Sequence, residues 1–138
     1  MKIVLHAGFH KTGTTTVQNA LKTNRSTLAP EIHILLKNDL TGLIGATKGY
    51  SSSLDPLDLA LISFETAQVA QTLRDHHAVI ISAESLCGHI PGRDNIRDYA
   101  AAPEILRYST CVPHGCGPRL MSIWMNLPTA PILMRWPG

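Results

Sequence analysis

The sequence predicts an α/β fold with a mainly parallel sheet. Three short runs of aliphatic and β-branched residues lack the alternation of a half-exposed strand, which is typical of strands buried on both faces: they span residues 2–8, 32–36 and 78–82. Segments with helical spacing of apolar residues separate these runs. Strands that alternate with helices pair in parallel, because each helix returns the chain to the same edge of the sheet.

The predicted first helix begins at Thr14, where the spacing of apolar residues becomes helical. Val17, Ala20 and Leu21 then share one face. We expect Thr12 or Thr14 to cap this helix, because a threonine hydroxyl can accept a hydrogen bond from an unpaired amide of the first turn.

A second helix is predicted from Asp55 to about Arg74. Asp55 suits the N-cap position and Pro56 suits the first helical position, where a missing amide proton costs nothing. Its buried face is predicted to carry Leu57, Leu61, Phe64 and Leu73.

The remaining segments are assigned from their glycine, serine and proline content. Residues 38–53 contain three glycines and several serines, which predicts a flexible loop. A short helix is expected between Ile96 and Tyr108, with Pro103 interrupting or restarting it. The composition changes near residue 108, so residues 1–108 are predicted to form the α/β region and residues 109–138 an irregular tail.

Composition bounds the class of protein. The chain has 138 residues, of which 44% are hydrophobic and 16% charged, as expected for one globular domain. A net charge of +2 without a run of Lys or Arg predicts neither a nucleic-acid nor a membrane partner. Three cysteines are too few for a disulfide framework, and the N-terminus does not resemble a signal peptide, so we expect a cytoplasmic protein.

A metal site is not expected. Cys111, His114 and Cys116 lie close together in the sequence, but they match no familiar zinc motif and no fourth ligand is evident.

The stretch HAGFHKTGTTTVQ, residues 6–18, places a glycine, a lysine and several hydroxyls directly after the first predicted strand. In a parallel sheet this position meets a helix N-terminus, whose unpaired amides and positive dipole end attract anions. Gly13 lets the backbone approach a ligand, and Lys11 adds a full positive charge. The hydroxyls come from Thr12, Thr14, Thr15 and Thr16. These residues predict a binding loop for a phosphate or sulfate group.

The loop has two other interpretations. A strand-to-helix turn favours glycine and threonine without any ligand, although that does not explain the lysine. A Walker A loop requires lysine directly after its second glycine, whereas Lys11 precedes Gly13 and Thr14 follows it. The sequence therefore departs from the ordinary nucleotide triphosphatase pattern.

The segment GFHKTGTTTVQNAL resembles the 5′-phosphosulfate-binding loop of sulfotransferases that use 3′-phosphoadenosine 5′-phosphosulfate (PAPS). The match covers residues 11–15, and His10 replaces the proline that is usual in this family. The resemblance implies a P-loop-like, three-layer α/β domain. It also implies PAPS as the sulfuryl donor, with no metal required, and a hydroxyl of a carbohydrate or small metabolite as the acceptor.

The resemblance assigns roles to the loop. Lys11 would contact the bridging oxygen and the leaving phosphate, while the amides and hydroxyls of residues 12–16 would hold the 5′-phosphate. The family's base is a His or Glu at the end of a neighbouring strand, and Glu84 follows the run AVIIS at such an end. Glu84 has a second interpretation as a helix cap or surface ion pair. His10 has two as well, an anion contact or an alternative base.

One family signature is missing. No strand followed by an arginine and a suitably spaced serine, which would bind the 3′-phosphate, is evident after residue 80. The domain is therefore expected to be incomplete or truncated. Two alternatives to a sulfotransferase stay open: an inactive nucleotide-binding remnant and a P-loop kinase or NTPase. A homo-oligomer also stays open, since a partner could cover an exposed sheet edge.

Overall fold

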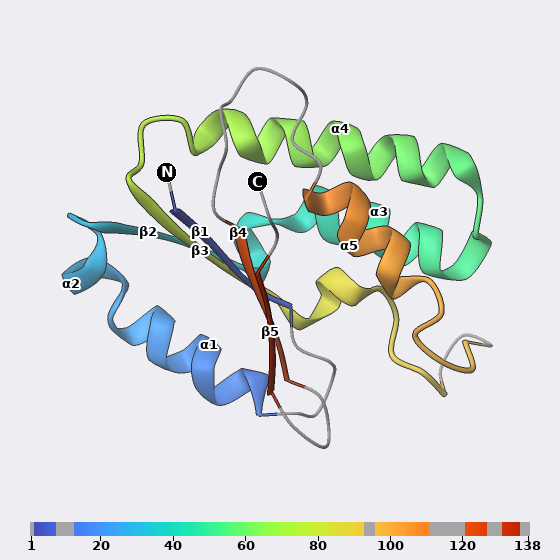
Figure 1. Cartoon of the computed structure of the whole chain (residues 1–138), viewed down its shortest axis with the longest axis horizontal. Coiled ribbons are helices and arrows are strands. Elements are labelled where there is room, and N and C mark those ends of the chain that lie inside the picture. Colours follow the sequence, from blue (N-terminus) through green and yellow to red (C-terminus); the bar gives the residue numbers. More distant parts are fainter. Residues whose placement is uncertain (1, 8–12, 93–95, 111–120, 127–130, 136–138) are drawn as a thin grey trace.

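The computed structural model describes residues 2–7, 13–92, 96–110, 121–126 and 131–135 (Figure 1). In these ranges the chain is a mixed helix and strand fold, as the sequence predicted. The helices are α1 (Thr14–Thr23), α2 (Arg25–Leu28), α3 (Thr41–Ser53), α4 (Pro56–Thr72) and α5 (Ala102–Thr110), with 3-10 turns η1 (Lys37–Asp39) and η2 (Glu84–Cys87).

The sheet has the strand order β2-β3-β1-β4-β5. The strands are β1 (Lys2–His6), β2 (Ile32–Leu36), β3 (Ala78–Ser82), β4 (Met121–Asn126) and β5 (Pro131–Arg135). The first four in this order pair in parallel, and β5 runs antiparallel to β4. The three strands predicted from sequence are confirmed. In residues 109–138, where no regular element was expected, the structure has β4 and β5.

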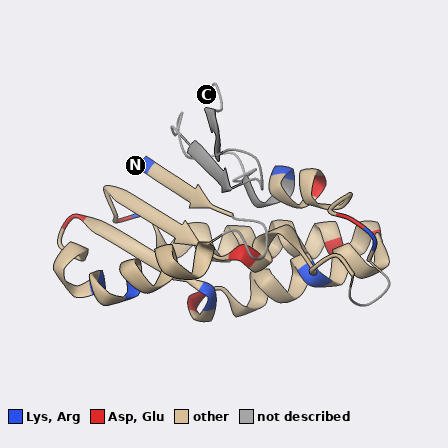
Figure 2. Ribbon diagram, turned by 90° about the horizontal axis from the view of Figure 1, so that it is seen from below, with Lys and Arg blue, Asp and Glu red and all other residues tan. Residues whose placement is uncertain are grey.

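The helices lie on both sides of the strands. In Figure 1, α1 lies below the sheet, while α3, α4 and α5 lie above and to the right of it. Charged residues are scattered along the described ribbon, and neither sign forms a continuous run (Figure 2). Among the described residues, no helix is both long enough and apolar enough to cross a membrane.

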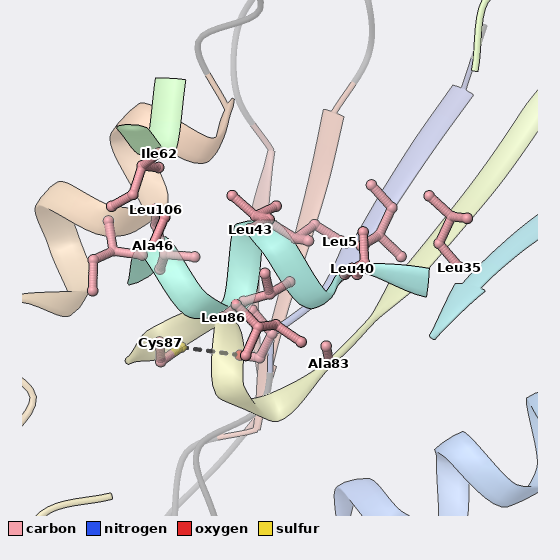
Figure 3. Packing of buried hydrophobic residues seen from close by; sticks show 14 of the residues in the cluster. Leu5, Leu35, Leu40, Leu43, Ala46, Ile62, Ala83, Leu86, Cys87 and Leu106 are labelled. Carbon is pink, nitrogen blue, oxygen red and sulfur yellow. Dashed lines mark hydrogen bonds between the residues drawn. The ribbon is translucent and has the colours of Figure 1, made fainter. Parts of the chain in front are cut away.

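The core forms where the sheet meets α3 and η2. Side chains from α3 and η2 point toward the strands in Figure 3, with Leu43 and Leu86 near its centre. The core includes Ile3, Leu5, Leu35, Val79 and Ile81 from the strands and Leu40, Leu43, Ile44, Ile62, Leu73, Leu86 and Ile105 from the helices and turns. This packing fixes η2, and with it the residues that follow β3.

The prediction of a flexible loop at residues 38–53 is wrong, because most of this segment forms α3. Leu43 and Tyr50 are buried on the face toward the core. A Cβ at Gly42 would meet the Glu65 carboxylate of α4, so glycine leaves room for this side chain in its present position. Burial of the apolar face outweighs the intrinsic cost of a mid-helix glycine, about 0.5–1 kcal/mol.

The predicted start of α4 is confirmed. The Asp55 carboxylate accepts a hydrogen bond from the Leu57 amide at 2.8 Å, and Pro56 occupies the first turn. The helix ends at Thr72, close to the predicted end, and Leu73 forms the C-cap. The cap and the proline therefore fix where α4 begins, independently of which face it buries.

The predicted buried face of α4 is wrong for three of its four residues. Leu57, Leu61 and Phe64 are 77%, 44% and 57% exposed, whereas Leu73 is buried as expected. Ile62 is fully buried instead. The helix is apolar on two sides, so the pattern of apolar residues alone does not identify the side that packs on α3 and α5.

Pro103 restarts the chain as a helix. It is the second residue of α5, where no intrahelical partner for its missing amide proton is needed. The helix thus begins later than residue 96, and residues 96–101 form the irregular approach to it.

Two substitutions at neighbouring positions of α4 test this packing. Ile62→Ala should lower the free energy of unfolding by about 2–5 kcal/mol, because it opens a cavity in the core. Leu61→Ala should lower it by less, about 1 kcal/mol, since its side chain is 44% exposed and its removal opens no enclosed cavity. Urea unfolding measures both, and an equal loss for the two variants would contradict the observed rotation of α4.

Candidate functional site

The loop predicted to bind an anion joins β1 to α1 at the carboxyl end of the sheet. Gly13 is the N-cap of α1 and has a φ of 82°, in the left-handed region that glycine adopts without strain. The predicted site residues His10, Lys11 and Thr12 lie outside the described residues, so their roles remain predictions.

Thr14 does not cap α1, contrary to one of the two expectations. It lies one residue past the N-cap and is 1% exposed. Its hydroxyl donates a hydrogen bond to Glu84 Oε2 at 2.6 Å. The hydroxyl therefore connects the first turn of α1 to the end of another strand instead of to its own helix.

Glu84 follows β3 by one intervening residue, Ala83, and is the first residue of η2. The register places the last residue of β3 opposite the last residue of β1. The carboxylate consequently reaches the helix that follows the loop, and the structure brings together two of the residues singled out from sequence, Thr14 and Glu84.

The other described threonines of this segment, Thr15 and Thr16, face solvent. The Thr16 amide donates to the Gly13 carbonyl at 3.1 Å. The first amides of a helix otherwise have no partner within it, and the positive end of the helix dipole lies at the same place. The start of α1 thus presents accessible hydroxyls at a position suited to an anion.

His6 and Ser82, the last residues of β1 and β3, join the ends of these two strands. His6 Nδ1 and Ser82 Oγ form a buried hydrogen bond of 2.7 Å. Burial lowers the pKa of His6 below its ordinary value. His6 thus packs within the sheet. Ser82 and Ser85 are also buried.

Cys87, the last residue of η2, contacts the end of β1 at the same place. Its Sγ donates a weak hydrogen bond to the Ala7 carbonyl at 3.8 Å (dashed in Figure 3). Burial raises the pKa of this thiol to about 12, so it is a protonated packing group at neutral pH. Sequence reasoning missed this role. The available signal was the three-residue spacing from Glu84, which places both side chains on one face of a 3-10 turn.

Metal ligands do not gather in the described part of the chain. It contains no group of three or more His, Cys, Asp or Glu side chains placed to hold an ion. Cys111, His114 and Cys116 lie outside the described residues.

Comparison with known proteins adds no relative. No protein-family model matches the chain, and neither a curated protein nor a solved structure matches it.

Replacing Thr14 by valine tests the link between α1 and β3. Thr14→Val should lower the free energy of unfolding by about 1.5–3 kcal/mol, because it removes a buried donor from a charged acceptor. Thr15→Val, at an exposed position of the same turn, should change it by less than about 0.5 kcal/mol. Chemical denaturation compares them, and equal effects would argue against the hydrogen bond to Glu84.

The lowered pKa of His6 predicts acid sensitivity. Well above pH 6.5 both the folded and the unfolded chain hold neutral His6, so its contribution to stability is complete. As the pH falls from 7 to 5, the unfolded chain binds a proton that folded His6 resists, and the free energy of unfolding decreases. His6→Asn, which keeps a polar group near Nδ1, should reduce this decrease, whereas exposed His77→Asn should not. Identical pH slopes for His6→Asn and the wild type would contradict it.

Proposed function

We propose that this chain is a PAPS-dependent sulfotransferase that transfers a sulfuryl group to a hydroxyl of a carbohydrate or small metabolite. The hydrogen bond from Thr14 to Glu84 is the observation that carries the proposal. It holds a strand-end carboxylate beside the helix start that follows Lys11. A donor-binding loop and a candidate base therefore adjoin each other, as sulfuryl transfer requires.

Each part of the proposed reaction falls to a named residue. The start of α1 and Lys11 bind the 5′-phosphosulfate and neutralise the leaving phosphate. The acceptor oxygen attacks sulfur, so an O–S bond forms as the bond from sulfur to the bridging oxygen breaks. Glu84 takes the acceptor's proton, and adenosine 3′,5′-bisphosphate leaves. His10 is the alternative base or a further contact to the anion.

Charge favours different roles for Glu84 and for the hydroxyls at the start of α1. A carboxylate repels the phosphates of the donor, so Glu84 serves best at the side of the loop where the acceptor enters. Thr14 is buried and its hydroxyl is taken up by Glu84, which leaves exposed Thr15 and Thr16 as the described hydroxyls for the donor. Gly13 contributes an unobstructed backbone, since nothing lies within 4 Å of the place its Cβ would occupy.

The proposal extends to fold and location. We assign the chain to a P-loop-like, three-layer arrangement, supported by helices on both sides of a mainly parallel sheet. A cytoplasmic location without nucleic-acid or membrane partners follows from the composition, and a homo-oligomer stays open. The missing 3′-phosphate signature favours one alternative, a remnant that binds the nucleotide without turnover.

Calorimetric titration with adenosine 3′,5′-bisphosphate tests the donor site. Lys11→Ala should weaken binding about ten- to a hundredfold, the cost of losing a charged hydrogen-bond donor. Lys22→Ala is the matched control, because Lys22 is an exposed residue at the other end of α1. Tighter binding of ATP with Mg²⁺ would instead support a kinase or NTPase, and binding of neither nucleotide would refute the proposal.

Turnover with PAPS and an acceptor screen separates the enzyme from the remnant. Glu84→Gln should keep bisphosphate binding but lower the rate about 10²–10⁴-fold, the contribution typical of a general base. Exposed Glu31→Gln should leave both unchanged. Bisphosphate binding by a wild-type chain that transfers no sulfuryl group to any acceptor would identify the remnant.

A further inference from the structure

A pocket of about 230 Å³ lies beside the candidate site, on the far side of η2. Its walls come from the end of α3, from Cys87 of η2, from His89, and from residues 96–101. Nothing in the proposed roles of the loop or of Glu84 uses it. Cys87 is the shared element, since it lines the pocket while its thiol contacts the Ala7 carbonyl at the start of the loop.

The pocket lining contains both a positively and a negatively charged side chain. Arg97 supplies a guanidinium and Asp98 a carboxylate. Asp98 Oδ1 accepts a hydrogen bond from the Ala100 amide at 2.8 Å, which fixes the side chain and leaves Oδ2 to accept another. The Ser52 hydroxyl donates to the Lys48 carbonyl at 3.2 Å, so toward a ligand it acts as an acceptor. One cation and one anion balance, which favours an uncharged ligand whose groups both donate and accept, as hydroxyls do.

The volume limits the ligand to a small molecule. At ~30 Å³ per water, the pocket has room for roughly seven waters, or one molecule of roughly a dozen heavy atoms. Pockets for larger organic ligands start at about 300 Å³.

The rim of the pocket carries a strained apolar residue. Leu54 lines it with a φ of 55°, in the left-handed region where glycine would end α3 with less strain, and its side chain is 59% exposed. Leu54 therefore adds a strained, apolar residue to the lining of a polar pocket. Such a group suits the carbon face of a ring whose edges carry hydroxyls.

Glu84 is not among the described residues that line this pocket. It begins η2, whereas the pocket meets this turn at its last residue, Cys87. The pocket is therefore separate from the Glu84 carboxylate.

We propose that this pocket binds a small, uncharged, polyhydroxylated molecule, such as a monosaccharide unit. Binding of the polyol does not rest on the proposed function.

The test titrates the ¹⁵N-labelled full chain with glucose, followed by amide chemical shifts. Glucose should shift resonances around the pocket, and glucuronate and glucosamine, which have the same ring but a charge, should bind several-fold more weakly. Asp98→Asn and Arg97→Gln should each weaken glucose binding about tenfold, as expected when a charged hydrogen-bond partner is lost. Arg74→Gln, an exposed arginine away from the pocket, is the matched control. Ser52→Phe should abolish binding by filling the space.

Calorimetry with adenosine 3′,5′-bisphosphate on the same samples shows that each variant is folded and separates the two proposals. Bisphosphate binding without a glucose response up to about 50 mM, well above the ~1 mM of a weak ligand, would overturn the pocket and leave the proposed function intact. A glucose response without bisphosphate binding would support the polyol pocket and count against the proposed function. A glucose response that Ser52→Phe leaves unchanged would overturn the pocket as the binding site.

Discussion

The parallel register between β1 and β3 is the constraint on which the candidate site depends. It sets His6 opposite Ser82 and joins them by a buried hydrogen bond, so the two strands end at the same level. Only with this register do the loop after β1 and the turn after β3 meet, as the bond from Thr14 to Glu84 shows. A slip of one residue would turn every side chain of a strand to the opposite face and separate these groups. The site is therefore a product of strand alignment as much as of loop sequence.

Features with a local physical cause could be predicted from the sequence. The apolar runs define three strands because both of their faces are buried, and Asp55 with Pro56 defines the start of α4 because cap chemistry acts within one turn. Glu84 could be placed near the loop, since carboxyl ends of parallel strands share one edge. In each case the deciding interaction involves neighbouring residues or a rule about strand direction.

Features decided by distant residues could not be predicted. The glycines of α3 predict a loop until α4 is known to lie beside two of them, with Glu65 near Gly42 and Asp58 near Gly49. Thr14 has the chemistry of a cap, and only the position of Glu84 shows that its hydroxyl bonds elsewhere. The polar pocket behind η2 is likewise assembled from three separate segments, and no motif marks it. A sequence pattern indicates which interactions a residue can make, whereas its neighbours in the folded chain decide which of them it makes.

Because α4 is apolar on two sides, hydrophobic burial stabilises its packing without fixing which side packs against the rest of the protein. Successive helical residues differ by about 100°, so turning α4 by one residue would replace Ile62 with Leu61 at nearly equal hydrophobic gain. Orientation about the helix axis is then biased by other groups. Gly42 leaves room for the Glu65 side chain in its present position, and the hydrogen bond between Ser53 and Asp58 also favours the observed orientation. Polar and glycine positions thus favour one rotation of α4 about its axis. Its leucines contribute hydrophobic stabilisation that depends little on this rotation.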